Sequence, residues 1–373
     1  MKKTRVLHMP LTNSGSGVTH YVLNNLRFID QERFCFDVAT RSKSLDFEDV
    51  IRAAGGKVHF LSCNYQENEK QFIKEMNTVL DEGYDAVHLH TSYWKGFQIE
   101  EMAMARKVPE IIVHAHNTMV DISDPEKRAD AVRTHNQLKS KFSEKLATRF
   151  CACSRQAAEW LFGGQVVPDK IIILKNAVDV DAFTYNTVTR DKIRKELGLD
   201  GCLVLGNVGR FSYQKNHALL MEVFEKIVRV RNDARLLLIG DGPLEEDIRQ
   251  VATKKGIIDK TLFLGRFDNV AASMQAMDMY LHPALFEGLG FVLVEAQTSG
   301  LWCLAGDAVP SEVKFTPNLE FLPYDADSWV RAILERGDKY ERLDCSGRAA
   351  EAGFSLREQS KVLEKLYTGQ CVS

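Results

Sequence analysis

No apolar run in the sequence approaches the roughly 18 residues that a membrane-spanning helix requires, so we expect no transmembrane segment. The 48 basic residues nearly balance the 51 acidic ones, whereas a general nucleic-acid binder is normally basic. The eight cysteines include no CxxC pair, and a chain of 373 residues needs no disulfides for its core. The apolar stretch after Met1–Lys3 is too short and too polar for a signal peptide. We therefore expect a cytoplasmic protein.

Short apolar runs alternate with helical patterns along most of the chain, which predicts parallel sheets covered by helices on both faces. Expected strands of the first half are 5–9, 35–39, 58–61, 86–89, 111–114, 150–153 and 171–174. Those of the second half are 203–208, 235–239, 261–264, 279–282, 302–304 and 320–322. Helical patterns between the first strands include 19–28, 71–81 and 131–146.

The alternation breaks over residues 179–201, which are polar and charged. We therefore predict an α/β protein with two Rossmann-like domains that face each other across a cleft. The expected divisions are 1–180, a linker at 181–200, 201–350, and a final helical segment at 351–373. Folds of this class bind ligands at the carboxyl ends of their strands.

A glycine-rich turn comes directly after the first expected strand. Gly15 and Gly17 open a helix there, and a helix N-terminus attracts anions. His20, however, stands where the dinucleotide motif GxGxxG has its third glycine. The turn is either a ligand loop or a plain tight turn.

Two cations come after the first strand of the second half. Arg210 is next to Gly209, and Lys215 lies five residues further on, just before a helical pattern. Arginine can fork onto phosphate oxygens, and lysine supplies a mobile point charge. The pair predicts a phosphate site, and the alternative is a solvated loop with ordinary surface charges.

Glu287 and Glu295 flank a glycine turn that starts a helix near Phe291. Both carboxylates could converge with the free N–H groups of Gly290 and Phe291 on one ligand. Carboxylates accept bonds from hydroxyls, and a helix N-terminus accepts anions. The combination suits a nucleotide-sugar, which is part polyol and part phosphate.

Residues 200–310 resemble the donor half of the family 4 retaining glycosyltransferases. The shared segments are Gly209-Arg210 with Lys215-Asn216, Gly240-Asp241-Gly242-Pro243-Leu244, Phe263-Leu264-Gly265, the glutamate pair and Ser299-Gly300. The first half matches more loosely, through 14–17, 85–90, 114–118, 153–154 and 175–179. The most similar members are those of bacterial exopolysaccharide or capsule synthesis. The family often has Gly-Gly near its N-terminus, whereas Ser16 separates the two glycines here, which favours Gly17 for ligand contact.

This resemblance implies the GT-B fold, with an N-terminal acceptor domain, a C-terminal donor domain and a last helix, 356–367, that crosses back to the first domain. It implies a retaining hexosyl- or acetylhexosaminyl-type transferase that uses a nucleotide-sugar, most often a UDP-sugar, and a glycan or lipid-linked acceptor. Because Arg210 and Lys215 can stabilise the leaving diphosphate, we expect activity without a metal or other cofactor.

The resemblance also implies roles for individual residues. Arg210 and Lys215 would hold the diphosphate, Glu295 the ribose hydroxyls and Glu287 the sugar hydroxyls. His116 would lie near the anomeric carbon and the acceptor. The other donor contacts would be Gly17, Gly265, Arg266, Gly290 and Phe291.

Two sets of residues could instead point to a metal. The HxH pairs His88/His90 and His114/His116 would suit a zinc hydrolase, with Asp121 and Asp124 as the only nearby carboxylates. Asp179-Val180-Asp181 matches the DxD motif of the other glycosyltransferase fold, but its place at the linker favours a structural role. Asp325-Ala326-Asp327 is expected to be a turn and helix cap.

Two rivals need no metal. One is a glycosidase that uses Glu287 and Glu295, although Arg210 and Lys215 would then have no role. The other is a nucleotide- or sugar-binding protein of two lobes, without transferase activity.

Residues 125–155 carry eight basic and three acidic side chains. Leu138, Phe142 and Leu146 recur every four residues, which predicts an amphipathic helix. There are two alternatives. Either the apolar stripe packs onto the sheet and leaves a solvated basic face, or the segment rests on anionic lipid at the inner face of the membrane.

Overall fold

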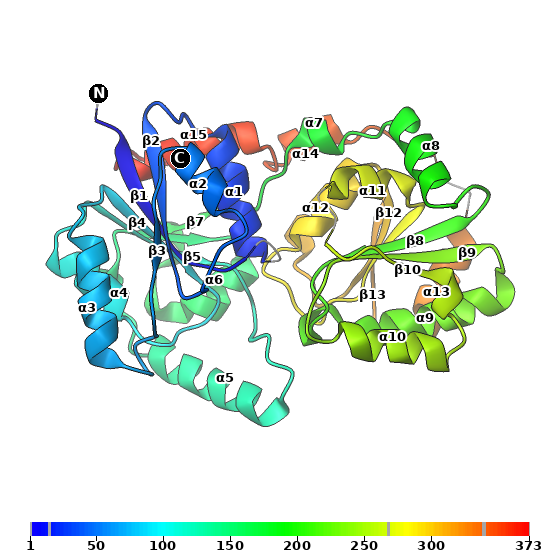
Figure 1. Ribbon diagram of the computed structural model, residues 1–373, viewed down its shortest axis with the longest axis horizontal. Helices are drawn as coiled ribbons and strands as arrows, with labels where there is room; N and C mark the ends of the chain where they lie inside the picture. Colours follow the sequence, from blue (N-terminus) through cyan, green and yellow to red (C-terminus); the bar gives the residue numbers. More distant parts are fainter. Residues whose placement is uncertain (1, 14–15, 267–268, 338–340, 373) are drawn as a thin grey trace. The chain divides into compact units, whose positions relative to one another are not determined.

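The computed structural model describes residues 2–13, 16–266, 269–337 and 341–372. It divides into two compact α/β units (Figure 1). The N-terminal unit comprises residues 1–120, 124–176 and 356–373, and the C-terminal unit comprises residues 121–123 and 177–355. No helix in the described ranges is long and apolar enough to cross a membrane.

The N-terminal unit is built on a parallel sheet with the strand order β3-β2-β1-β4-β5-β6-β7. Its strands are β1 (Thr4–Leu11), β2 (Phe34–Thr40), β3 (Val58–Phe60), β4 (Ala86–Thr91), β5 (Glu110–Ala115), β6 (Arg149–Ala152) and β7 (Ile171–Ile173). All seven strands expected from the apolar runs are present. The interior strands β2 and β5 are buried along their whole length, as continuous rather than alternating apolar patterns predict.

The helices of this unit follow the 3.6-residue period of buried positions. In α3, for example, Phe72, Met76, Val79 and Leu80 face the core, and the Asn68 side chain caps the helix by accepting from the Gln71 N–H. The helices are α1 (Gly17–Phe28), α2 (Glu48–Ala53), α3 (Glu69–Leu80), α4 (Gln98–Ala105), α5 (Pro125–Lys139), α6 (Arg155–Leu161) and α15 (Leu356–Tyr367).

The C-terminal helix α15 packs against α1, so the expected return of the chain to the first domain is confirmed (Figure 1). Leu363, Leu366 and Tyr367 are buried in the same core as Tyr21 of α1. The Asn25 side-chain amide of α1 donates to Gln359 of α15 over 3.1 Å.

The helix expected over residues 131–146 is wrong in both bounds. Asp124 caps α5 by accepting from the N–H groups of Glu126 and Lys127, so the helix begins at Pro125 and ends at Lys139. Phe142 lies beyond that end and is buried against the Trp94 ring, 4.7 Å between centroids. The four-residue spacing therefore reflects separate packing contacts and not one helical stripe.

The C-terminal unit has a second parallel sheet with the order β10-β9-β8-β11-β12-β13. Its strands are β8 (Leu203–Val208), β9 (Ala234–Ile239), β10 (Thr261–Phe263), β11 (Met279–His282), β12 (Trp302–Gly306) and β13 (Leu319–Leu322). Its helices are α7 (Val180–Phe183), α8 (Thr187–Glu196), α9 (His217–Val230), α10 (Glu245–Lys254), α11 (Val270–Ala276), α12 (Phe291–Thr298), α13 (Ala326–Arg336) and α14 (Ser346–Glu351). The prediction of two parallel Rossmann-like sheets is confirmed.

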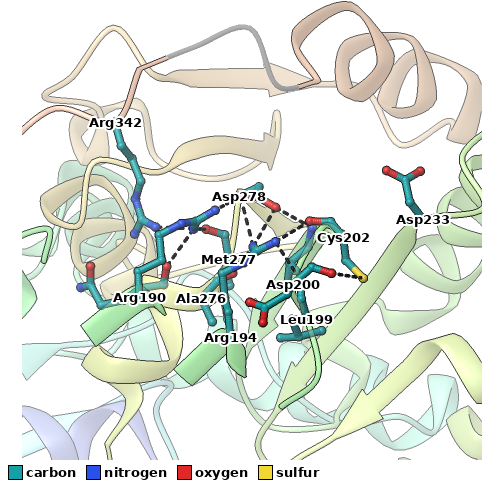
Figure 2. A network of polar contacts seen from close by, with 12 residues as sticks. Arg190, Arg194, Leu199, Asp200, Cys202, Asp233, Ala276, Met277, Asp278 and Arg342 are labelled. Atoms are coloured by element: carbon teal, nitrogen blue, oxygen red, sulfur yellow. Dashed lines mark hydrogen bonds and ion pairs between the residues drawn. The ribbon is translucent and has the colours of Figure 1, made fainter. Parts of the chain in front are cut away.

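A network of arginines joins α8 to the end of α11 at the amino-terminal edge of this sheet (Figure 2). Arg194, which is 8% exposed, donates to the carbonyls of Ala276, Leu199 and Cys202. Arg342 donates to the carbonyls of Met274 and Ser299, among others. Carbonyls at a helix C-terminus lack partners within the helix, so these guanidinium groups satisfy them.

A cavity of about 420 Å³ adjoins this network and is lined by Arg190, Arg194, Arg231 and Arg342 together with Asp233 and Asp278. Arg190 and Arg194 both pair with Asp278, and Arg231 pairs with Asp233. These arginines are bonded to carbonyls and carboxylates, and the cavity lies at the amino-terminal ends of β8 and β11.

Candidate functional site

The loops after β8, β9 and β10 meet at the carboxyl edge of the C-terminal sheet. Gly209 donates its N–H to the Ile239 carbonyl over 2.9 Å, and Gly240 donates to the Gly265 carbonyl over 2.8 Å. A Cβ on Gly240 would lie 2.1 Å from the Gly209 oxygen, and one on Gly242 would lie 2.4 Å from the Phe211 oxygen. The two glycines are therefore required because the loop backbones approach too closely for a side chain.

Arg210 lies on this rim with an exposed side chain. Its guanidinium makes no hydrogen bond or ion pair with any residue in the described ranges. Lys215 ends a short 3₁₀ turn, Tyr213–Lys215, after which Asn216 adopts the left-handed conformation with φ 49° and starts α9. The two predicted cations thus lie on one loop, and within the described ranges the Arg210 donors are not bonded.

Lys215 is paired with Glu287, which lies beyond the end of β11. Its ammonium lies 2.5 Å from Glu287 Oε1, and both side chains are largely buried. Burial alone would raise the pKa of Glu287, but the Lys215 charge and a hydrogen bond from His282 outweigh it and lower that pKa to about 2. Glu287 is therefore a carboxylate at any physiological pH and can only accept hydrogen bonds.

His282 and Tyr280 belong to this group, although the sequence patterns did not single them out. His282 Nε2 lies 3.0 Å from Glu287 Oε1, and its Nδ1 lies 3.1 Å from the Tyr280 hydroxyl. Burial lowers the pKa of His282, so the ring is neutral. Only their position in the sequence could have indicated these residues. They lie two apart on β11, and His282 ends that strand five residues before Glu287.

Glu295 is buried in the second turn of α12 and is 8% exposed. Its carboxyl group has no hydrogen bond or ion pair within the part of the chain that the structure describes. Burial raises its pKa to about 8. A buried carboxyl group without partners is costly, so this group is suited to a ligand that brings hydrogen-bond donors.

The N-terminus of α12 is open in the same region. Gly290 precedes the helix with φ 93°, and no side chain caps it. Its carbonyl accepts from the Leu293 N–H, but the N–H groups of Gly290 and Phe291 donate to no described residue. These two donors and the helix dipole favour an anion at this point.

The remaining predicted residues lie in three places. Gly265 supplies the carbonyl that joins the β9 and β10 loops, and Arg266 pairs with Asp241 over 2.7 Å beside them. Gly17 is the first residue of α1 in the N-terminal unit, while Ser14 and Gly15 of the same turn lie outside the described residues. His116 comes directly after β5, also in the N-terminal unit.

The histidine pairs lie in two groups of three imidazoles whose ring nitrogens are close together. Nitrogen atoms of His90, His114 and His116 come within 4.8 Å of one another, as do those of His8, His88 and His90. The His88 and His90 rings are stacked, with centroids 4.3 Å apart and planes 25° from parallel. His90 belongs to both groups, and its two ring nitrogens are already hydrogen-bonded to His8 and His116.

The carboxylates proposed to complete a metal site have other roles. Asp121 accepts from the Gln214 N–H in the C-terminal unit, over 3.1 Å, and Asp124 caps α5. Asp179 caps α7 by accepting from the Ala182 N–H, and Asp325 caps α13. The structural interpretations of Asp179 and Asp325 are confirmed.

Comparison with known proteins gives consistent results over both halves of the chain. The model described as Glycosyltransferase Family 4 matches residues 15–182, and the model described as Glycosyl transferases group 1 matches residues 189–344. A Bacillus subtilis (strain 168) protein named as glycosyltransferase EpsF is 30% identical over 318 residues, covering 83% of this chain and 80% of the relative. The UDP-Gal:alpha-D-GlcNAc-diphosphoundecaprenol alpha-1,3-galactosyltransferase of Escherichia coli is 25% identical over 387 residues, covering 100% of this chain and 98% of the relative.

Among solved structures, Anabaena HepE in complex with UDP-glucose is similar in fold. Its TM-score is 0.76 at 17% identity, and the match covers 98% of this chain and 99% of that one. Sucrose-phosphate synthase from Thermosynechococcus elongatus has a TM-score of 0.79 at 18% identity, with 99% of each chain covered.

Proposed function

The chain belongs to glycosyltransferase family 4 and has the GT-B fold, and from that premise we propose that it is a retaining, metal-independent transferase of a hexose or N-acetylhexosamine. The donor is a UDP-sugar, and the acceptor is a glycan or lipid-linked intermediate of exopolysaccharide or capsule synthesis. Family membership sets aside the glycosidase, the zinc hydrolase and the simple binding protein.

The unpartnered carboxyl group of Glu295 is the observation that carries the proposal. It is buried without a hydrogen-bond partner in the described chain, so it needs donors from outside. The two hydroxyls of a ribose supply such donors, and a carboxylate can accept both. Glu295 therefore holds the nucleoside, with Gly265 and Arg266 beside the base.

The diphosphate is held by Arg210, Lys215 and the N–H groups of Gly290 and Phe291. When the bond between the sugar and the phosphate breaks, negative charge grows on the leaving diphosphate. Preorganised cations and backbone dipoles lower that barrier, and they do so without a metal ion. The ionised Glu287 accepts hydrogen bonds from sugar hydroxyls and keeps Lys215 in place.

Retention is accounted for by a front-face displacement. The acceptor oxygen bonds to the anomeric carbon on the face that the diphosphate leaves, and a donor phosphate oxygen takes the acceptor proton. The nucleoside diphosphate is released with the bonding electrons. His116 and Gly17 of the N-terminal unit are proposed to contact the substrates, on the basis of the family resemblance.

The acceptor proposal rests on the Escherichia coli relative, whose name specifies a diphosphoundecaprenol-linked sugar. An acceptor of that kind lies in a membrane, so we place this protein at its inner face, bound peripherally through the basic segment 125–155. Lys141 and Lys145 are exposed there, beyond the end of α5. Co-sedimentation with anionic vesicles at low salt, lost in Lys141→Glu/Lys145→Glu, tests this contact.

Thermal unfolding in the presence of nucleotides tests the donor site. UDP and one UDP-sugar should raise the unfolding temperature more than GDP or ADP and their sugars, because a ligand that binds only the folded state stabilises it. No shift with any nucleotide would contradict the proposal.

A further inference from the structure

Five histidines share one face of the central strands in the N-terminal sheet. Register pairs His8 of β1 with His88 of β4, and His90 of β4 with His114 of β5. His116 is two residues further on and therefore points to the same side. Tyr21 of α1 and Tyr367 of α15 cover this face, with rings within 6.3 Å of the imidazoles.

Three of these rings form a continuous chain of hydrogen bonds. His8 Nδ1 lies 3.0 Å from His90 Nε2, and His90 Nδ1 lies 2.9 Å from His116 Nε2. His90 thus uses both of its nitrogens. The chain runs from the interior, where His8 is 1% exposed, to His116, which is partly exposed at the carboxyl end of β5.

A second chain packs against the first and fixes the ring orientations. The Tyr367 hydroxyl lies 2.9 Å from His88 Nδ1, and His88 Nε2 lies 3.1 Å from His114 Nδ1. The His114 and His116 rings have centroids 4.0 Å apart. The imidazoles of the first chain therefore have little freedom to turn.

All three rings of the first chain are neutral, because burial lowers the pKa of His8 and His116 to about 3 and lowers that of His90 as well. A neutral imidazole has one N–H donor and one acceptor nitrogen. Two hydrogen bonds in series then leave two arrangements. Either all three rings carry the proton on Nδ1, or all three carry it on Nε2.

The interior end of the chain decides between these arrangements. His8 Nε2 is buried and has no hydrogen-bond partner. With the proton on Nε2 of every ring, this atom would be a buried N–H without an acceptor, which is rare and costly. With the proton on Nδ1, each interior N–H has an acceptor, and the last one, on His116, lies at the partly exposed end of the chain.

We propose that His8 and His90 are positioning residues that hold His116 as the Nδ1–H tautomer, so that it presents a hydrogen-bond donor to its ligand. Free histidine in water favours the Nε2–H form, so the chain reverses the intrinsic preference. A neutral Nδ1–H group can donate to a phosphate or hydroxyl oxygen and cannot take a proton at that atom. The role of His116 toward substrate rests on the proposed function, whereas its tautomer does not.

Nitrogen NMR of histidine-labelled, ligand-free protein tests the tautomer directly, because protonated and bare ring nitrogens have well-separated shifts and distinct couplings to the ring protons. Signals are assigned by substituting each histidine in turn. His217 of the C-terminal unit lies outside the histidine chain, so its signals serve as an internal reference for the ring-nitrogen shifts. His116 should be predominantly Nδ1–H in the wild-type protein. A predominant Nε2–H form would overturn the proposal.

Two variants separate positioning from packing. His90→Asn keeps a side-chain N–H where His90 Nδ1 stood, so His116 should remain Nδ1–H. His90→Leu removes that donor, and His116 should shift toward Nε2–H, while an unchanged tautomer in a folded His90→Leu protein would contradict the proposal. In a transfer assay His90→Leu should lower kcat roughly tenfold with little change in donor KM, and His90→Asn should restore most of it. A wild-type Nδ1–H signal without transferase activity would instead count against the proposed function alone.

Discussion

Replacing Glu295 by glutamine should stabilise the free protein and weaken nucleotide binding. The pKa of Glu295 is raised from 4.5 to about 8, so between these values the folded protein holds this proton more tightly than the unfolded chain does. The contribution of this proton to the free energy of unfolding has its full value below pH 4.5, and it is lost as the pH rises from there through 8. The loss is about 1.4 kcal/mol per pH unit, or about 3 kcal/mol between pH 6 and pH 8. Glutamine has the same shape and does not titrate.

Urea unfolding of both proteins from pH 6 to pH 9 measures the effect. The free energy of unfolding of Glu295→Gln, relative to wild type, should rise by about 3 kcal/mol over pH 6–8 and then level off. Glu351→Gln, on an exposed glutamate of the same unit, should show no such pH dependence. A pH-independent difference for Glu295→Gln would refute the argument that Glu295 is buried without partners.

Calorimetry of UDP binding completes this prediction. Loss of the carboxylate should cost about 1.5–3 kcal/mol, which is a ten- to hundredfold weaker affinity. Hydroxyl donors favour the ionised carboxylate, so wild-type binding near pH 7 should release a proton, and the variant should release none. Equal affinity in the two proteins would remove Glu295 from the site.

Three further predictions concern the charges of the C-terminal unit. Lys215→Ala removes the buried cation that pairs with the Glu287 carboxylate. It should reduce the free energy of unfolding by about 3 kcal/mol and weaken UDP binding, measured by urea unfolding and calorimetry, whereas Glu287→Gln/Lys215→Met should recover stability but not binding. Arg194→Ala removes hydrogen-bond partners from Ala276, Leu199 and Asp278, which lie far from the site. It should therefore lower the free energy of unfolding by about 2–4 kcal/mol without changing UDP affinity. An unchanged free energy of unfolding would contradict the structural role of that network. Transfer activity should be unchanged in excess chelator, and a loss restored by magnesium or manganese would show that the diphosphate needs a metal.

The sequence predicts the fold well because its signals are local. All thirteen expected strands coincide with the observed ones to within a few residues, since continuous apolar runs between turns are characteristic of doubly covered parallel strands. The final helix also has its expected bounds, 356–367. The failure at 131–146 had a local cause as well, because Asp124-Pro125 is a helix-start signal that the four-residue spacing of Leu138 and Phe142 concealed.

The sequence predicts which residues belong to the candidate site, but it does not predict which of them contact one another. Arg210, Lys215, Glu287 and Glu295 were identified from their places after expected strands and at a helix start. The pairing of Lys215 with Glu287 across 72 residues of chain, and the isolation of Glu295, depend on tertiary contacts that no spacing reveals. The histidine chain is similar: HxH pairs predict side chains on one face, but the order of hydrogen bonds depends on the register of β1, β4 and β5.

Nucleoside diphosphate release during sugar transfer tests the central claim most directly. The wild-type protein is incubated with a panel of UDP-, GDP- and ADP-sugars and a lipid-diphosphate-linked sugar acceptor, and the diphosphate and the anomeric configuration of the product are measured by chromatography and NMR. We predict UDP release with a product that keeps the configuration of the donor, and loss of both in Arg210→Ala/Lys215→Ala. An inverted product, equal release by the double variant, or no diphosphate from any donor would contradict the account.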